Sequence, residues 1–195
     1  FAIPPFVSIV IQIKIYGISI MLNSIVFSIL VVLLNIQNKD MHTDYLTGVY
    51  NRKKLTTYLK KKIDMCTHNK SFSAIMLDIN HFKKINDTFG HEMGDKALIS
   101  SAAILKSCIK SNDLLARFGG DEFIIIMNTS NLNELEESVR KIRNSTDRFN
   151  KTNPLDYELS FSMGYAVYDY NAHMTAEEFQ NHIDKLMYSD KVCNK

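Results

Sequence analysis

Charge is nearly absent from the first 38 residues. Lys14 is the one charged residue among them, and residues 15–38, IYGISIMLNSIVFSILVVLLNIQN, contain none. A helix that crosses a bilayer needs ~20 predominantly apolar residues, so this run predicts a membrane segment over 1–38 with a transmembrane helix at about 15–36. A buried core helix would be shorter and have a polar face. A signal peptide would need a small-residue cleavage site, which is missing before Lys39.

Basic residues return directly after this segment, at Lys39 and then at several positions between 52 and 62. Lysine and arginine beside a span favour the cytoplasmic side, so the expected location is the cell membrane, with the rest of the chain in the cytoplasm. The same basic run also fits a solvated helix face. The chain begins with Phe1 and not with Met, which allows the segment to be the end of a longer membrane region.

The rest of the chain lacks both a charge imbalance and a cysteine pattern. Of the 23 basic residues only Lys14 precedes residue 39, and all 21 acidic residues follow it. Such a balance argues against a nucleic-acid partner, because non-specific nucleic-acid binders carry a strong basic excess. The three cysteines are odd in number and far apart, so they form neither a zinc pattern nor a disulfide framework. This fits a reducing compartment.

Hydrophobic periodicity beyond residue 38 predicts alternating helices and strands. A linker over 39–50 comes first, with a turn at Gly48, and the polar stretch 81–95 indicates a loop with short helical pieces. Thr175 and Glu178 predict a capping box, and Gly164 indicates a bulge or bend. The predicted helices are 51–68, 96–110, 132–149 and 175–191, and the predicted strands are 71–79, a hairpin over 114–128, and two short strands within 157–170.

This order of elements predicts an α+β fold of the ferredoxin-like kind, as in nucleotidyl cyclases and polymerase palms, with an antiparallel-centred sheet and helices on one face. In that fold Asp78, at the end of strand 71–79, meets Asp121 and Glu122 at the hairpin. Three carboxylates in one place repel each other unless cations neutralise them. Such oxygen ligands suit Mg²⁺, which supports phosphoryl transfer. A tight hairpin with solvated acids is the alternative that these residues leave open.

Several segments together resemble the GGDEF family of bacterial diguanylate cyclases. DYLTGVYNR (44–52) is similar to the family's D-x-L-T-G-L-x-N-R, and LDINHFKKINDTFGHEMGD (77–95) follows D-[ILV]-[DN]-x-F-K-x-[IV]-N-D-x-x-G-H-x-x-G-D. ARFGGDEF and SFSMG occur in the expected order. The resemblance assigns 44–195 to a GGDEF domain. It implies that two GTP molecules condense to cyclic di-GMP and two pyrophosphates in a homodimer, with one half-site on each subunit.

The resemblance also implies roles for the acidic residues. Mg²⁺ (or Mn²⁺) would be bound by Asp78, by the backbone carbonyl of Ile79 and by Asp121. Asp121 or Glu122 would help to deprotonate the ribose 3′-hydroxyl that attacks the α-phosphate.

Substrate-binding residues follow from the same resemblance. Asn86 and Asp95 would read the guanine edge, since an amide oxygen and a carboxylate can accept from its N1–H and 2-amino donors. DKLMYSDKVCNK (184–195) is similar to the family's D-x-A-[LM]-Y-x-[AS]-K-x-x-G-R-N, and its departures include Lys195 in place of the arginine and Asn194 in place of the glycine. Lysine keeps a point charge for phosphate but loses the bidentate fork. The phosphates would be contacted by Lys83, Gly119, Gly120, Lys191 and Lys195.

A second departure from the family concerns regulation. Many members carry R-x-x-D upstream of the GGDEF motif as a product-inhibition site, and here the segment is Lys110-Ser111-Asn112-Asp113. Lysine can approach guanine O6 and N7, but it lacks the bidentate grip of arginine. Lys110 and Asp113 therefore form a degraded site, and weak or absent inhibition by cyclic di-GMP is expected.

Three hypotheses follow. The first is an active, membrane-anchored diguanylate cyclase, which the intact acids favour. The second is a catalytically silent GGDEF-like module that binds GTP or serves only to dimerise, which the substitutions at Lys110 and Lys195 favour. The third is another nucleotidyl cyclase or palm-like enzyme, against which Asn86 and Asp95 argue.

Overall fold

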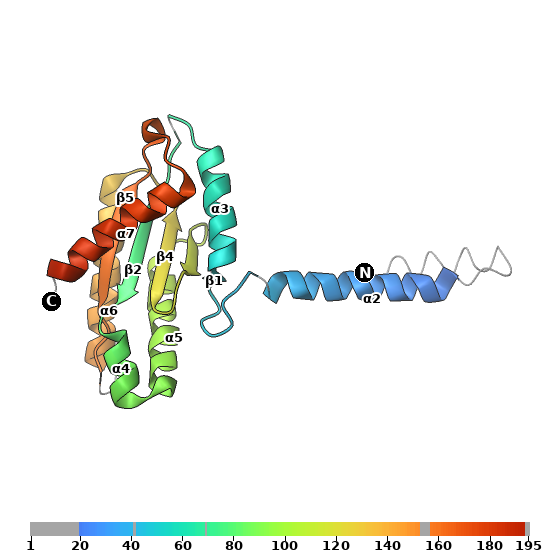
Figure 1. The fold of residues 1–195 in the computed structure, drawn as a ribbon, viewed down its shortest axis with the longest axis horizontal. Coiled ribbons are helices and arrows are strands. Elements are labelled where there is room, and N and C mark those ends of the chain that lie inside the picture. Colours follow the sequence, from blue (N-terminus) through green and yellow to red (C-terminus); the bar gives the residue numbers. More distant parts are fainter. Residues whose placement is uncertain (1–19, 41, 69, 153–156, 194–195) are drawn as a thin grey trace. The chain divides into compact units, whose positions relative to one another are not determined.

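The computed structural model describes residues 20–40, 42–68, 70–152 and 157–193, and the chain divides into two compact units, 1–42 and 43–195. In the first unit the described residues form helix α2 (Ile20–Asp40) (Figure 1). The second unit holds the described strands and the other helices. The division falls inside the predicted linker 39–50.

Helix α2 does not meet the requirements of a membrane span. Along the described chain, no helix combines the length and the apolar character that crossing a bilayer demands. Polar residues interrupt α2. Ten residues, 25–34, separate Ser24 from Asn35, and Ser28 is one of them, whereas a span needs ~20 predominantly apolar residues. The predicted transmembrane helix and the cell-membrane location inferred from it are therefore wrong. Residues 15–19 of that prediction lie outside the described residues.

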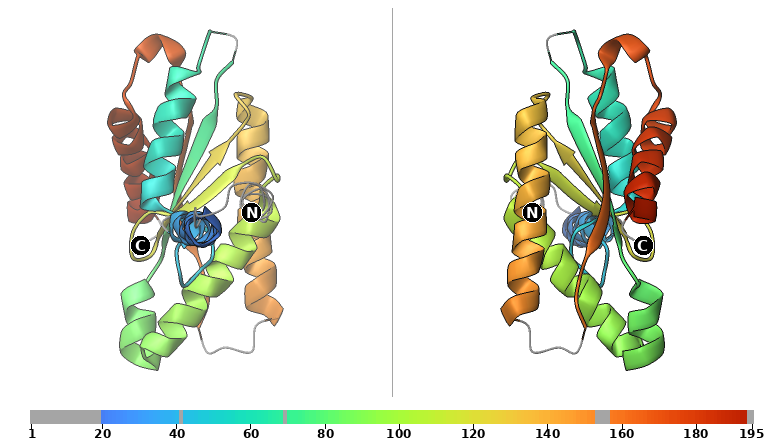
Figure 2. Two further views of the ribbon diagram at one scale, coloured as in Figure 1. Left: turned by 90° about the vertical axis from the view of Figure 1, so that its right-hand side faces the viewer. Right: turned by 90° about the vertical axis from the view of Figure 1, so that its left-hand side faces the viewer.

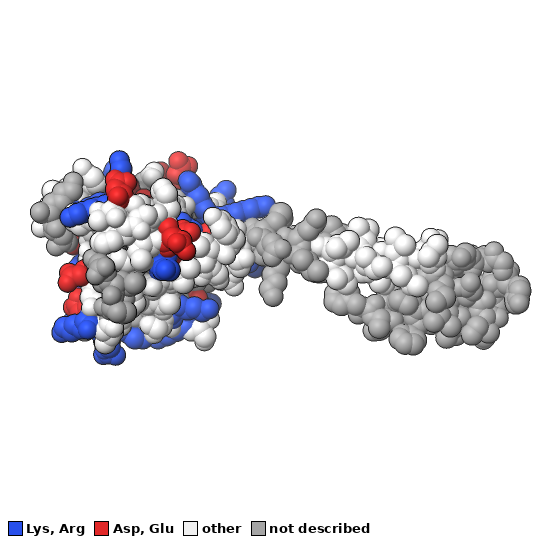
Figure 3. All heavy atoms as spheres, turned by 90° about the horizontal axis from the view of Figure 1, so that it is seen from below, with Lys and Arg blue, Asp and Glu red and all other residues white. Residues whose placement is uncertain are grey.

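The 43–195 unit carries charges of both signs on its surface. On the face drawn in Figure 3, lysine and arginine side chains are interspersed with aspartate and glutamate. This view shows no broad field of one sign, in agreement with a formal net charge of +2 for the whole chain.

The described strands form one mixed sheet in the order β1-β3-β4-β2-β5. The β2/β4, β2/β5 and β3/β4 pairs are antiparallel, as predicted for the centre of the sheet, whereas β1 runs parallel to β3. Residues 157–170 contain one strand and not the two predicted, because pairing with β2 continues without a bulge through Met76 and Gly164. The strands are β1 (Tyr50–Asn51), β2 (Ser73–Ile79), β3 (Leu114–Arg117), β4 (Glu122–Met127) and β5 (Phe161–Val167).

Helices cover both faces of this sheet, and the prediction of helices on one face is wrong. Figure 2 shows α3 and α7 on one side of the strands and α5 and α6 on the other. Two separate apolar clusters fill the two interfaces. Strand β2 is buried along its whole length, which is typical of a strand covered on both faces. These helices are α3 (Arg52–Asp64), α5 (His91–Cys108), α6 (Leu132–Thr152) and α7 (Ala176–Cys193).

Residues 81–95 are more helical than their polarity indicated. Helix α4 (Phe82–Phe89) follows β2 closely, and α5 already begins at His91. Gly90 separates the two helices with φ = +85°, a left-handed conformation that glycine adopts without steric cost. Ile85 and Leu98 pack into the core, so tertiary burial stabilises both helices.

The start of α7 follows the predicted capping box. The backbone N–H and the Oγ1 of Thr175 each donate to Glu178 Oε2 at 2.8 Å, and Glu178 N–H donates to Thr175 Oγ1 at 3.2 Å. These reciprocal bonds satisfy N–H groups that a helix start leaves unpaired. The hydrogen bonds from the Thr175 backbone and hydroxyl lower the pKa of Glu178.

Gly164 allows α7 to lie directly on β5. A Cβ atom at this position would stand 2.1 Å from Ile183 O and 2.2 Å from Met187 N. Those atoms belong to the helix backbone, so they cannot move aside as a flexible side chain would. Glycine is required here for close approach of two backbones and not for the predicted bulge.

Candidate active site

The acidic site forms where β2 ends beside the β3–β4 hairpin. Asp78 pairs with Glu122 across the two antiparallel strands. The N–H of Ile79, the last residue of β2, donates to the carbonyl oxygen of Asp121 at 3.2 Å. The register of the sheet therefore brings together the residues predicted to bind metal and to act in catalysis. Their roles remain predictions.

Burial and the repulsion between neighbouring carboxylates raise pKa values in this acidic cluster. Burial, followed by the charges of Asp78, Asp121 and Asp184, raises the pKa of Glu122. Burial and the charge of Asp78 likewise raise the pKa of Asp121. Asp184 lies on α7 and was missed by the sequence analysis, although it falls in the segment that resembles the C-terminal family motif. The site holds more negative charge than its own basic residues neutralise, which favours a bound cation.

Lys191 supplies the nearest positive charge. Its Nζ donates to Asp78 Oδ1 at 2.7 Å, and the Asp78 side chain is only 9% exposed. The lysine predicted to bind phosphate therefore lies within hydrogen-bonding distance of a predicted metal ligand. Lys195, the second predicted phosphate contact on this segment, lies outside the described residues.

The two glycines of the hairpin have different surroundings. A Cβ atom on Gly119 would stand 2.3 Å from Glu122 Oε2, so the glutamate side chain lies over this residue. Gly120 has open space where its Cβ would be. The open side at Gly120 can admit a ligand close to the backbone, whereas the Glu122 side chain covers Gly119. The phosphate contacts of both glycines remain predictions.

Arg117 fixes this turn to the segment that precedes β1. Its Nε and Nη2 donate to the carbonyl oxygen of Gly120 at 3.1 and 2.7 Å. Its Nη1 lies 3.2 Å from both carboxylate oxygens of Asp44. Asp44 also accepts from the N–H and Oγ1 of Thr47 at 2.9 and 2.6 Å. The ion pair thus joins two motifs that are separated by more than 60 residues.

The groups around Asp44 favour its ionised form. Burial alone would raise its pKa, but hydrogen bonds from Thr47 and the Arg117 charge outweigh burial, and the pKa lies below 3.8. Both motifs are visible in the sequence, but no local signal in it predicts a role for Arg117 or Asp44. Only the fold shows that the arginine points back from the hairpin to the first loop.

The predicted guanine-reading residues lie on the helix pair α4 and α5. Asn86, on α4, places its Oδ1 where a Cβ on Gly94 would stand, 1.9 Å away. Asp95 is the next residue on α5 and is exposed, as is Lys83 on α4. The glycine thus lets the Asn86 amide come close to the α5 backbone beside Asp95. Asp95 is exposed and Asn86 is half-buried, and their guanine-reading role remains a prediction.

The donor set fits a magnesium ion that substrate helps to bind. No group of three or more His, Cys, Asp or Glu side chains with metal-binding geometry occurs among the described residues. Mg²⁺ commonly takes only one or two carboxylates and completes its shell with water and substrate phosphates. Asp78 and Asp121 provide two such carboxylates. Burial and then the charge of Asp78 raise the pKa of Asp121, and a bound cation would relieve the repulsion between the two carboxylates.

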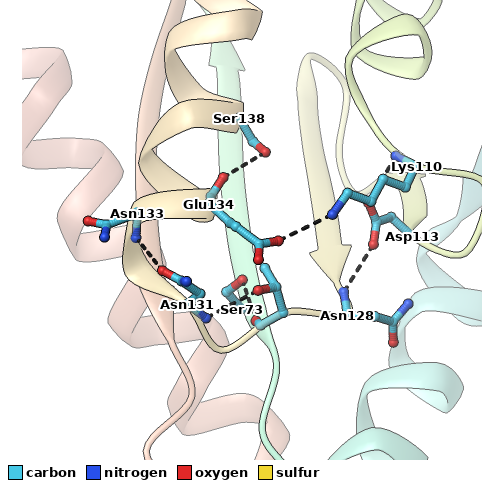
Figure 4. Close-up of polar contacts among 9 residues, drawn as sticks. Ser73, Lys110, Asp113, Asn128, Asn131, Asn133, Glu134 and Ser138 are labelled. Atoms are coloured by element: carbon cyan, nitrogen blue, oxygen red, sulfur yellow. Dashed lines mark hydrogen bonds and ion pairs between the residues drawn. The ribbon is translucent and has the colours of Figure 1, made fainter.

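The predicted product-inhibition turn is occupied by internal contacts (Figure 4). Asp113 accepts from the backbone N–H groups of Lys110 and Asn128, both at 3.0 Å. Lys110 Nζ lies 3.2 Å from Glu134 Oε2 on α6, in an exposed ion pair. Both predicted side chains therefore have partners within the chain, and a ligand would have to compete with them.

Comparison with known proteins identifies the family of this fold and site. The family model described as diguanylate cyclase, GGDEF domain, matches residues 41–194. The chain therefore belongs to the GGDEF family, as the sequence motifs predicted.

Individual relatives agree with this assignment. The chain is 35% identical over 124 residues to the probable diguanylate cyclase DgcC of Escherichia coli, covering 63% of this chain and 33% of the relative. It is 31% identical over 159 residues to the E. coli diguanylate cyclase DosC, covering 80% and 34%. The chain thus spans about a third of the length of these curated relatives.

A solved structure supports the fold. The coiled coil and GGDEF domain of DgcB from Caulobacter crescentus, in complex with c-di-GMP, superimposes with a TM-score of 0.81 at 22% identity. The match covers 89% of this chain and 92% of that one. At this identity the comparison shows the fold alone.

Proposed function

We propose that this chain acts as a diguanylate cyclase, which joins two GTP molecules into cyclic di-GMP and releases two pyrophosphates. The observation that carries the proposal is the meeting of Asp78, Asp121 and Glu122 beside an open glycine turn. Family membership and relatives named as diguanylate cyclases support the reaction.

Each part of the site has a chemical task in this proposal. Asp121 or Glu122 takes the proton from the 3′-hydroxyl, and the raised pKa of each carboxyl brings it closer to neutrality, where a general base is most effective. Arg117 holds the Gly120 carbonyl and so fixes the turn against which the phosphates lie. Lys191 contacts the terminal phosphates as a point charge.

A divalent cation completes the site. Asp78, Asp121 and the carbonyl of Ile79 would hold Mg²⁺ or Mn²⁺. When bound, the ion neutralises phosphate charge and polarises the reacting phosphorus. The acids of this chain orient that ion and, in turn, are relieved of their mutual repulsion.

Two chains are required for a complete reaction, because each carries one half-site for one GTP. We therefore propose a homodimer as the working unit. At limiting protein concentration the rate should rise more steeply than in proportion to concentration, whereas an enzyme that works as a monomer would give a linear dependence.

A silent GTP-binding module is the second candidate. The ion pair of Lys191 with Asp78 favours it, because the lysine occupies one of the two carboxylates that a metal needs. A rival nucleotidyl cyclase would accept ATP. Asp95 argues against it, because a carboxylate only accepts hydrogen bonds: guanine offers it the N1–H and 2-amino donors, whereas adenine N1 is itself an acceptor.

One experiment separates these functions. The full chain is incubated with Mg²⁺ and either GTP or ATP, and the products are identified by chromatography and mass spectrometry. The proposal predicts cyclic di-GMP from GTP and no cyclic product from ATP. Binding of GTP without any product at high protein concentration would support the silent module, and a cyclic product from ATP would overturn the assignment of substrate.

A further inference from the structure

The carboxylate of Asp190 joins the last turn of α7 to the edge of the sheet. Its Oδ2 accepts the backbone N–H of Met163 on β5 at 2.9 Å. The same carboxylate lies 3.4 Å from Arg143 Nη2, on α6. Since β5 ends the strand order and α6 covers the face opposite to α7, one side chain links three elements around this edge.

The next residue along α7 is Lys191, which donates to Asp78 at 2.7 Å. Asp78 pairs with Ser162 in the sheet, and Met163 follows Ser162 on β5. Two consecutive residues of α7 therefore contact two neighbouring positions of the sheet. One contact is to the backbone of the edge strand and the other is to the acidic site.

A lysine ammonium on a flexible four-carbon stem reaches a fixed point reliably only when its backbone is fixed. Here the described part of α7 ends at Cys193, two residues beyond Lys191, and helix ends fray unless they are tied down. Close packing at Gly164 holds the middle of α7. Asp190 holds its end.

We propose that Asp190 is a positioning residue for phosphate binding. It fixes the backbone of Lys191 so that the ammonium stays at the acidic site and meets the terminal phosphates of GTP. This inference rests on the proposed function. The family pattern has alanine or serine at this position, so the contact distinguishes this chain from that pattern.

The test compares variants of the full chain by steady-state kinetics and by equilibrium binding of a fluorescent GTP analogue. Asp190→Ala should raise KM and the analogue Kd about tenfold, the scale of one charge-assisted hydrogen bond. The value of kcat should change little, because binding to ground state and transition state is lost equally. Asp190→Asn keeps an acceptor for Met163 N–H and should fall in between.

A double-mutant cycle shows whether Asp190 acts through the lysine. If it does, Asp190→Ala combined with Lys191→Ala binds the analogue no more weakly than Lys191→Ala alone. Ser189→Ala, a neighbouring exposed position on α7, is the matched control and should behave as the wild type. Additive effects of the two substitutions, or an unchanged Kd in Asp190→Ala, would overturn the proposal.

Hydrogen exchange measured by mass spectrometry separates this inference from the proposed function. Amide exchange in the last turn of α7 should be faster in Asp190→Ala than in Ser189→Ala, with or without nucleotide. If the wild type binds no GTP, the proposed function fails, and the exchange rates still decide whether Asp190 holds the helix end. Equal rates in both variants would overturn the positioning role.

Discussion

Replacing Arg117 by methionine tests how the hairpin turn is held. Arg117 and Asp44 are each only 15% exposed, and the guanidinium contacts both Asp44 oxygens and the Gly120 carbonyl. Removing one partner of a fully buried ion pair typically costs about 3–5 kcal/mol, and this pair is only partly buried. Asp44 keeps its two bonds from Thr47, so the low end, about 3 kcal/mol, is expected.

The assay is urea unfolding of the full chain at pH 7, followed by thermal melting. A loss of about 3 kcal/mol corresponds to a decrease in Tm of about 6–12 °C for a chain of this size. Arg140→Met, at an exposed position on α6, is the matched control and should change the free energy of unfolding by less than about 0.5 kcal/mol. A loss below about 1 kcal/mol in Arg117→Met, the value of a surface pair, would show that this ion pair does not hold the turn.

The same ion pair predicts a pH dependence. Because the pKa of Asp44 is lower in the folded protein than its ordinary value of 3.8, the ionised carboxylate stabilises the fold above that pH. This stabilisation is lost as the pH falls through the folded pKa. Asp44→Asn should therefore flatten the acid limb of the stability curve; an acid limb identical to the wild type would contradict this.

Three further predictions concern other parts of the domain. Glu122→Gln should raise the free energy of unfolding at pH 7 by up to about 1 kcal/mol, because it removes a repulsion that solvent partly screens. The substitution should have no such effect at pH 3, where the carboxyl is protonated in both the folded and the unfolded protein. Equal effects at both pH values would exclude repulsion as the cause. Gly164→Ala should destabilise the protein by about 3 kcal/mol in urea unfolding, because α7 must move off β5, and a neutral result would show that the helix gives way. Cyclic di-GMP should inhibit the wild type weakly, and Lys110→Ala should leave that inhibition unchanged; its loss would show that Lys110 binds the product.

Local sequence signals predicted the central elements well. The apolar run FIIIM after Gly119-Gly120 predicted the hairpin strand, and Thr175 with Glu178 predicted the helix start, because both signals depend on neighbouring residues. The predicted fold also placed Asp78 beside the hairpin acids, and the sheet pairs Asp78 with Glu122. In the first two cases residues close together in the sequence determine the local structure.

Features that depend on distant residues were not predictable in this way. The ion pair of Arg117 with Asp44 and the contact of Asp190 with Met163 each join segments that only the tertiary fold brings together. The sequence shows a glycine at position 164, but the reason that glycine is required there, the backbone of α7, lies some 20 residues away in sequence. The hydropathy of residues 15–38 predicted a membrane helix, whereas no helix among the described residues is long and apolar enough to cross a bilayer.

Asp121 and its neighbours are proposed to carry out the condensation of bound GTP to cyclic di-GMP. The most direct measurement compares wild type and Asp121→Asn for GTP-analogue affinity and for cyclic di-GMP formed from GTP and Mg²⁺. We expect Asp121→Asn to lose at least about 100-fold in product formation, the scale of general-base catalysis, while far-ultraviolet circular dichroism confirms that the variant is folded. Cyclic di-GMP production by folded Asp121→Asn at the wild-type rate would contradict this role.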